Sequence, residues 1–434
     1  MSFGTNMFKK IIILYYYFKT KYFSIFHREN LADWQDKKIR KFLKNILPKS
    51  KYYLKKYKDP DIKNWKHLPT IDKKEMMENF DDLNTVNISK ENAFNIAYKA
   101  EKERDFKPKI NNITVGLSSG TSGSRGIFLA TDIECYKWAG AVLAKILPKS
   151  IFCKNRIAFF LRANSNLYES VKSNTVKFCY FDMQKSLEFN LKKLDDFKPT
   201  IIIAPPSMLK LIAKNYNEIS INPEKIIAVA EVLEDIDKIF IEKVFKKTVH
   251  QIYQATEGFI ACTCEYGHLH INEDILYMQK EYLDEENGRF IPIITDFNRT
   301  TQPIIRYRLN DILTEDKEPC PCGSMFLRIK KIEGRCDDIF YFNSKDLKKL
   351  IPIFPDFLSR AIIFASSDVE EYKIIQNKID EIELYIDKKE EFNKIKRHLE
   401  LTLEKFNVEI PKIKLLDECP IDNTKKFKRV ESRI

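Results

Sequence analysis

The sequence predicts an α/β protein, with a large α/β body that includes β hairpins and a small α+β unit at the C-terminal end. Three observations predict this fold class. Short apolar runs alternate with helical patterns from residue 113 onward, hairpin patterns follow residue 270, and a second mixture of helix and strand follows residue 339. Strands that alternate with helices are typical of α/β bodies.

The elements of the body follow in chain order. Residues 8–58 predict helix with a break at Pro48, and residues 68–77 predict an extended segment followed by a capped helix. Strand candidates then lie at 157–161, 200–204, 225–230 and 249–253. Helix candidates lie at 187–197, 207–216 and 236–245, so helices and strands alternate as the layers of an α/β body require.

The last third of the chain contains hairpin candidates at 275–281, 289–295, 304–309 and 327–332. Beyond them, a helix is expected at 388–406. Its apolar face has three- and four-residue spacing and consists of Phe392, Ile395, Leu399, Leu403 and Phe406. We therefore expect a basic, aromatic helical arm at 1–65, a main domain at 66–338 and a small C-terminal domain at 339–434.

Composition excludes several classes of protein. Of the 434 residues, 44% are hydrophobic, which is enough for a sizeable core and excludes wholesale disorder. No apolar run approaches the roughly 18–20 residues that span a bilayer, and the N-terminal apolar run lacks the cleavage site of a signal peptide. The nine cysteines are an odd number, which argues against a disulfide scaffold. We expect a cytoplasmic protein.

The net charge of +12 lies entirely in the N-terminal arm. Residues 1–58 contain 15 Lys and Arg against 3 acidic residues, so the remainder is neutral and predicts no specific nucleic-acid partner. The arm could lie on an anionic membrane, at the inner membrane surface. Alternatively, it packs its aromatic side chains on the core and leaves its lysines in solvent. The second interpretation is favoured.

A glycine-rich loop is the strongest local signal. Four of the 11 glycines fall within residues 116–126, which read GLSSGTSGSRG. Glycines and small hydroxyl side chains let a loop present N–H and O–H groups to phosphate oxygens, and a neighbouring Arg adds charge. The candidate phosphate-binding residues are Ser118, Ser119, Gly120, Thr121, Ser122, Gly123 and Arg125.

This loop resembles the phosphate-binding signature of the adenylate-forming enzymes, which include acyl-CoA synthetases and adenylation domains. Four later stretches match the same superfamily in order. Residues 253–258 resemble YGxTE, 303–311 resemble PxIRYRTGD, 334–338 resemble the GRxDD hinge, and 425–430 resemble the terminal GKxxRV. Ala230 and Glu231 stand where the family has its G-A-E turn. The resemblance is closest to the phenylacetate–CoA ligase branch, with the deazaflavin-coenzyme adenylyl synthetases and CapK-like proteins.

The resemblance implies the adenylate-forming ligase fold and an ATP-dependent activation of a carboxylic acid to an acyl-adenylate. Transfer of the acyl group to a thiol would follow, with CoA as the expected acceptor. Glu257 would hold Mg²⁺, Asp311 would bind the ribose, and Lys426 would reach the α-phosphate and the carboxylate. The resemblance also implies that Arg335 meets ribose or phosphate. Further nucleotide-binding residues would be Glu231, Tyr253, Thr256 and Arg308.

The motifs depart from the family pattern at Ser124, Asn310 and Lys425, where the family has Lys, Gly and Gly. Two alternatives to the ligase therefore stay open. One is an adenylyltransferase that acts on a hydroxyl of a coenzyme. The other is a non-catalytic, membrane-associated scaffold with a degenerate nucleotide site.

A second group of residues predicts a metal site. Cys264, His270, Cys320 and Cys322 would give a Cys₃His set, which is typical of tetrahedral structural zinc. The family branch has a similar arrangement, which favours His270 over His268 as the ligand. The alternative is a set of reduced cysteines in hairpins beside a solvent-facing histidine.

Overall fold

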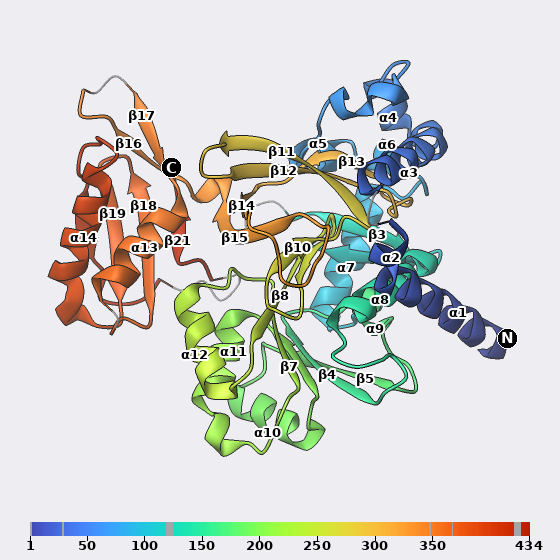
Figure 1. Ribbon diagram of the computed structural model, residues 1–434, viewed down its shortest axis with the longest axis horizontal. Helices are drawn as coiled ribbons and strands as arrows, with labels where there is room; N and C mark the ends of the chain where they lie inside the picture. Colours follow the sequence, from blue (N-terminus) through green and yellow to red (C-terminus); the bar gives the residue numbers. More distant parts are fainter. Residues whose placement is uncertain (1, 28–29, 119–124, 347–348, 367, 421–426) are drawn as a thin grey trace.

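The computed structural model describes residues 2–27, 30–118, 125–346, 349–366, 368–420 and 427–434 (Figure 1). Its centre is a 12-stranded sheet in the order β11-β12-β14-β15-β10-β9-β8-β7-β6-β4-β5, with β13 paired to β12. The first half of this sheet in the chain is parallel and consists of β4 (Asn155–Leu161), β5 (Val176–Asp182), β6 (Ile201–Ala204), β7 (Lys225–Val229) and β8 (Val249–Ala255).

Successive side chains of each parallel strand point to opposite faces of the sheet. Both faces are buried, because helices cover each of them. On β6, Ile202 and Ala204 join the core beneath α10 (Leu187–Phe197), α11 (Pro206–Lys214) and α12 (Asp235–Phe245). Ile201 and Ile203 join the core on the other side, beneath α8 (Asp132–Ile146). The four strands and three helices expected in this region are thereby confirmed, whereas β5 and α8 were not predicted.

The antiparallel half of the sheet contains the expected hairpin strands. Its members are β9 (Gly258–Thr263), β10 (Leu269–Ile271), β11 (Leu276–Asp284), β12 (Arg289–Asp296), β13 (Ile304–Arg308), β14 (Asp311–Glu315) and β15 (Arg328–Arg335). Strands β11 and β12 pair directly, as expected. The short strand β14, which was not predicted, lies between β12 and β15.

The glycine-rich loop joins two strands of a separate three-stranded sheet. This sheet consists of β1 (Lys109–Ile110), β2 (Ile113–Leu117) and β3 (Ile127–Thr131), all antiparallel. At the base of the loop, the backbone N–H of Ser118 donates to the carbonyl of Gly126 at 2.8 Å. The helices nearby are α5 (Lys73–Glu78), α6 (Phe80–Leu83), α7 (Lys90–Glu103) and α9 (Asn166–Glu169).

The N-terminal arm packs on the body. Helix α1 (Ser2–Lys21) lies against α8 so closely that a Cβ added at Gly140 would be 2.5 Å from the carbonyl oxygen of Ile13. The next helices are α2 (Phe23–His27), α3 (Leu31–Ile46) and α4 (Lys51–Lys56), and the apolar residues of α3 join the core beneath β11 and β12. None of the helices in the described ranges combines the length and apolar character needed to cross a bilayer.

Residues 339–434, called here the C-terminal unit, have a hydrophobic core of their own. A four-stranded sheet is formed by β18 (Tyr372–Lys378), β19 (Glu381–Ile386), β20 (Lys412–Leu415) and β21 (Val430–Ser432). It packs with α13 (Pro355–Ala365) and α14 (Phe392–Glu404), and β16 (Phe340–Asn343) pairs with β17 (Leu350–Ile353). Figure 1 shows this unit (orange to red) and α1 (dark blue) on opposite sides of the body.

The structure has the fold class that the sequence predicts, a large α/β body followed by a smaller α+β region. The division into an arm, a main domain and a mobile domain stays a prediction.

Candidate active site and candidate metal centre

A cavity of about 1300 Å³ lies where the glycine-rich loop, the ends of β7 and β8, strand β14 and the C-terminal unit meet. Most of the residues predicted from the sequence line it. They are Ser118, Arg125, Glu231, Tyr253, Thr256, Glu257, Arg308, Asp311 and Arg335. Carboxylates and cations from distant parts of the chain therefore share one cavity.

Glu257 lies at the turn where the sheet changes from parallel to antiparallel. Its side chain is buried, and the hydroxyl of Tyr307 donates to its Oε1 at 2.8 Å. Burial, and next the charge of Glu257, raises the pKa of Tyr307, so the phenol keeps its proton and remains a donor. Arg299 holds the turn by donating to the carbonyl of Thr256 at 3.0 Å. A carboxylate oxygen fixed in this way suits a hard cation such as Mg²⁺.

Asp311 lies at the start of β14, and the hydroxyl of Tyr253 donates to its Oδ2. On its other side, Nε of Arg335 is 3.8 Å from Oδ1. Asn310, which replaces the family's Gly, donates its amide to Asp337 at 2.5 Å. The departure at residue 310 therefore ties the ribose-clamp candidate to the segment that follows β15.

Arg125 makes contacts that the sequence did not predict. Its two Nη atoms donate to the carboxylate of Glu101 on α7, at 2.5 and 2.9 Å, and its Nε donates to the carbonyl of Ser118 at 3.2 Å. The guanidinium thus closes the base of the loop, and its contact with phosphate stays a prediction. Ser119, Gly120, Thr121, Ser122, Gly123 and Ser124 lie outside the described residues.

Two further candidates have partners within the protein. Arg308 forms a bidentate ion pair with Glu281, at 2.7 and 2.9 Å. Glu231 accepts the backbone N–H of Ser207 at 3.2 Å, near the N-terminus of α11, where an anion is favoured by the helix dipole. The preceding residue, Ala230, has a φ of 70°, a left-handed conformation that residues other than glycine rarely adopt.

Lys426 lies outside the described residues, but the residues that follow it are described. Phe427 and Lys428 line the cavity, and Nζ of Lys428 is 2.8 Å from Asp338. Arg429 then forms a bidentate ion pair with Asp237 on α12. These contacts hold the described segment that begins at Phe427 at the edge of the cavity.

Lys73 is a site residue that the sequence reasoning missed. It is the first residue of α5, it lines the cavity, and its Cε lies 3.4 Å from the position of a Cβ built on Gly126. Burial lowers its pKa, and the charge of Glu257 is the largest effect that opposes this. A cation therefore stands beside the base of the loop, although the loop itself has Ser124 where the family has Lys. No sequence motif marks Lys73, because only tertiary packing places it there.

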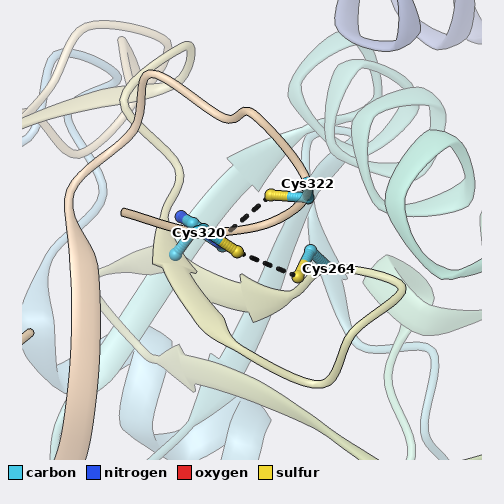
Figure 2. Close-up of side chains that lie close together, drawn as sticks. Cys264, Cys320 and Cys322 are labelled. Carbon is cyan, nitrogen blue, oxygen red and sulfur yellow. Dashed lines mark hydrogen bonds between the residues drawn. The ribbon is translucent and has the colours of Figure 1, made fainter. Parts of the chain in front are cut away.

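The four predicted metal ligands converge at a second place, where the end of β9, strand β10 and the loop between β14 and β15 meet. Figure 2 shows the three cysteines of this group. One ligand atom from each of Cys264, His270, Cys320 and Cys322 lies within 4.8 Å of the others. The backbone N–H of Gly323 donates to the carbonyl of Cys320 at 3.0 Å, and this glycine has a φ of 67°. The chain therefore turns at the Cys-Pro-Cys-Gly segment, which lets both thiols face one point.

The hydrogen bonds around His270 fit a metal ligand. Its Nδ1 is 3.1 Å from the carbonyl oxygen of Phe326, to which a protonated Nδ1 donates, so the lone pair is left on Nε2. Nε2 lies on the cysteine side, 3.5 Å from Sγ of Cys322. Three sulfur donors and one imidazole are a donor set that suits tetrahedral zinc. His268 also lies close, with its Nδ1 3.1 Å from Sγ of Cys320.

Comparison with known proteins agrees with this architecture. No family model matches the chain. Protein CapK of Staphylococcus aureus is 30% identical over 249 residues, which are 56% of this chain and 52% of that protein. Phenylacetate-coenzyme A ligase of Thermus thermophilus is 24% identical over 220 residues, which are 46% and 47% of the two chains. The chain spans about half the length of the curated relatives it matches.

A crystal structure of 2-hydroxyisobutyryl-CoA ligase in the postadenylation state superposes with a TM-score of 0.69. The match covers 92% of this chain and 89% of the ligase, at 16% sequence identity. In sequence the chain is similar to members of the adenylate-forming superfamily, and it shares the fold of that ligase. The sequence similarity is to the phenylacetate-CoA ligase and CapK-like branch.

Proposed function

We propose that the protein activates a carboxylic acid with ATP and then transfers the acyl group to a thiol, with CoA as the acceptor. The observation that carries this proposal is the convergence of Glu257, Asp311 and Lys73 at the base of the glycine-rich loop, in one cavity. The similarity to acid–CoA ligases supports the same reaction class.

In the first step, a carboxylate oxygen of the acid attacks the α-phosphorus of ATP, and pyrophosphate leaves. Little covalent chemistry is required of the protein, so its side chains act by positioning and by neutralising charge. Asp311 would accept hydrogen bonds from the ribose hydroxyls, and Lys73 and Lys426 would face the phosphates. Glu257 would hold Mg²⁺, which supplies positive charge to the phosphates when it is bound. In the second step, a thiolate attacks the acyl carbon and AMP leaves.

The C-terminal unit would supply different residues to the two steps. Its segment with Phe427 and Lys428 lies at the cavity in the present arrangement. We propose that this arrangement serves the first step, because it brings the chain next to Lys426 toward Glu257 and Asp311. Rotation about Asp337 and Asp338 would then expose the adenylate to the thiol.

Exchange of labelled pyrophosphate into ATP tests the proposal across a panel of aryl, fatty and amino acids. Acid-dependent exchange, followed by thioester formation with CoA, is the expected result. A stable adenylylated product without thioester would instead select the adenylyltransferase that acts on a hydroxyl. Absence of ATP binding would select the non-catalytic scaffold.

We also propose that Cys264, His270, Cys320 and Cys322 hold a structural zinc ion. Four protein ligands leave no position for water or substrate, so the ion would tie β9 to the loop before β15 and take no part in the reaction. The convergence of the four ligand atoms supports this assignment.

A third proposal is that the enzyme is cytoplasmic and lies on an anionic membrane surface through α1 and α2. One face of α1 is covered by α8, but a second apolar face is open to solvent. Its members, spaced by three or four residues, are 37% to 71% exposed: Phe8, Ile11, Tyr15, Phe18, Tyr22 and Ile25. Docking of a second copy through this face would bring two arms of charge +12 together, whereas anionic lipid complements that charge.

Cosedimentation with vesicles tests this contact. Binding is expected to vesicles that contain phosphatidylserine, to weaken with salt, and to fall strongly in the Ile11→Asp variant. Leu401→Asp, at an exposed apolar residue of α14, is the matched control and should bind as the wild type does. Equal binding by the two variants, or none by the wild type, would contradict the contact.

A further inference from the structure

Two lysines without an acidic partner line the cavity beside α1. Lys19 lies on α1 and Lys137 on α8, and both side chains are partly buried. Both ammonium groups lie near the ring of Tyr16, at 5.1 and 5.7 Å from its centroid. Within the described part of the chain, neither lysine forms an ion pair or a hydrogen bond. Positive charge is thus concentrated at one place in the cavity wall.

Asp274, an acidic residue near the two lysines, already has a partner in an ion pair. Asp274 is buried, and its ion-pair partner is a third lysine, Lys145, whose Nζ is 3.0 Å away. Burial lowers the pKa of Lys19, and Lys38 and Lys137 lower it further, while Asp274 opposes them. Partly buried cations without counter-charge cost free energy, and such groups in a cavity are candidates for ligand binding. Thr20, whose hydroxyl can also donate, lines the same part of the cavity.

The cavity joins these lysines to the proposed reaction centre. It extends from Glu257 past an apolar wall, to which α8 contributes Trp138, Ala141 and Val142 and β4 contributes Phe159. An acid that fills this space would place its reacting carboxylate near Glu257 and its apolar body along the wall. Whatever lies beside Lys19 and Lys137 would have to be a group that two ammonium ions stabilise.

We propose that Lys19 and Lys137 bind a second anionic group, a carboxylate, sulfate or phosphate, at the far end of the acid substrate. The inference rests on the proposed function and names its substrate class: acids with an apolar body and a distal anion. A charge-assisted hydrogen bond is stronger than a neutral one, so a substrate with the distal anion should be favoured by about 10- to 100-fold.

The test compares acids in matched pairs by pyrophosphate exchange. Each pair has the same carbon skeleton, aliphatic or aryl, and one member carries a carboxylate at the far end. For one skeleton length, the diacid should have a kcat/KM about 10- to 100-fold above that of the monoacid. This ratio should fall toward one in Lys19→Met and Lys137→Met, which keep the apolar stems. Lys10→Met, at an exposed lysine of α1, should leave the ratio unchanged.

A second measurement does not depend on turnover. Inorganic phosphate should raise the melting temperature of the wild type more than that of the Lys19→Met/Lys137→Met double variant. If monoacids support exchange and no diacid is preferred, the distal-anion assignment is overturned. A larger phosphate-dependent rise in the melting temperature of the wild type would then identify a site for a free anion. If no acid supports exchange, the proposed function fails, and an equal phosphate effect in both proteins would overturn the anion site as well.

Discussion

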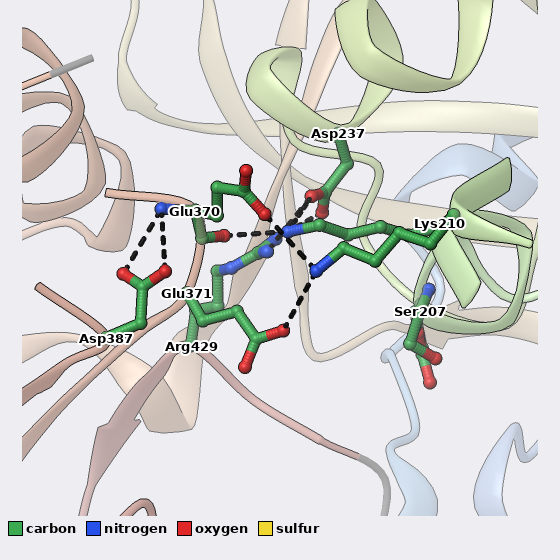
Figure 3. A network of polar contacts seen from close by, with 9 residues as sticks. Ser207, Lys210, Asp237, Glu370, Glu371, Asp387 and Arg429 are labelled. Atoms are coloured by element: carbon green, nitrogen blue, oxygen red, sulfur yellow. Dashed lines mark hydrogen bonds and ion pairs between the residues drawn. The ribbon is translucent and has the colours of Figure 1, made fainter. Parts of the chain in front are cut away.

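The contact between the C-terminal unit and the body depends on a buried ion-pair network. The Asp237→Ala substitution should weaken this contact and let the C-terminal unit undock. Figure 3 shows Arg429 of the C-terminal unit meeting Asp237 of α12, with Lys210 of α11 beside them. The side chains of Asp237, Arg429 and Lys210 are only 3%, 14% and 10% exposed. Lys210 also donates to the carbonyl of Glu370 at 2.8 Å, so the network joins two helices of the body to two parts of the C-terminal unit.

The free-energy cost of the Asp237→Ala substitution comes from the two cations that it leaves unpaired, Arg429 and Lys210. Without Asp237, the guanidinium and an ammonium group remain buried without the carboxylate that both contact, and removal of one partner of a buried pair costs about 3–5 kcal/mol. Undocking of the C-terminal unit returns both cations to water. We therefore expect the cost to shift the docking equilibrium by about 10²- to 10⁴-fold rather than to unfold the body. Buried ion pairs suit an interface that must open, because water solvates the charged groups when the two surfaces separate.

Hydrogen exchange and half-reaction assays measure this effect. In Asp237→Ala, amides of α11, α12 and β21 should exchange faster, while those of β4 and β6 should not. Acyl-adenylate formation should fall, and thioester formation from supplied acyl-adenylate should be retained. Asp417→Ala, which breaks an exposed pair with Lys389 inside the C-terminal unit, is the matched control and should change neither readout. Unchanged exchange at the interface, or equal loss of both half-reactions, would refute the reasoning.

Two further predictions concern metal and pH. The purified protein should contain about one zinc per chain, and Cys322→Ala should lose the metal and lower the melting temperature more than it lowers the activity of the folded fraction, because the site is structural. Burial raises the pKa of Asp296 to about 6, so the folded protein favours the neutral carboxyl. The unfolding free energy of the wild type relative to Asp296→Asn should therefore be highest below about pH 4 and should fall by about 3 kcal/mol as the pH rises to about 6.

Each of these two predictions has a result that would contradict it. Protein prepared without chelator that contains no zinc would leave only reduced cysteines at the cluster, and Cys153→Ala, at an exposed cysteine, controls for loss of a thiol. For Asp296, a difference from the Asn variant that stays constant between pH 4 and 6, or rises with pH, would exclude a raised pKa. Chemical denaturation at each pH provides the measurement.

Local patterns in the sequence predicted most of the framework. The apolar strand at β6 and the helix α10 follow from runs of neighbouring residues, and the glycine-rich loop joins two strands, β2 and β3, as expected. The positions of Cys264, His270, Cys320 and Cys322 could be predicted together because their spacing and side-chain chemistry restrict them to few arrangements.

What the sequence did not predict depends on contacts between distant segments. Lys73 has no motif of its own, and only the packing of α5 places it beside Gly126. Arg125 was expected to face phosphate, but Glu101 on α7 binds both of its Nη atoms. Strand β14 is short and carries no alternation long enough to distinguish it from a loop. Pairing partners of this kind are decided by tertiary structure and not by local sequence.

The exchange of labelled pyrophosphate into ATP tests the central claim most directly. With a suitable acid, the wild type should catalyse exchange that depends on both the acid and Mg²⁺. Glu257→Ala and Asp311→Ala should each abolish it, because the first removes the proposed metal ligand and the second removes the proposed ribose clamp. The account would be contradicted if a broad panel of acids gave no exchange, or if either variant retained full activity.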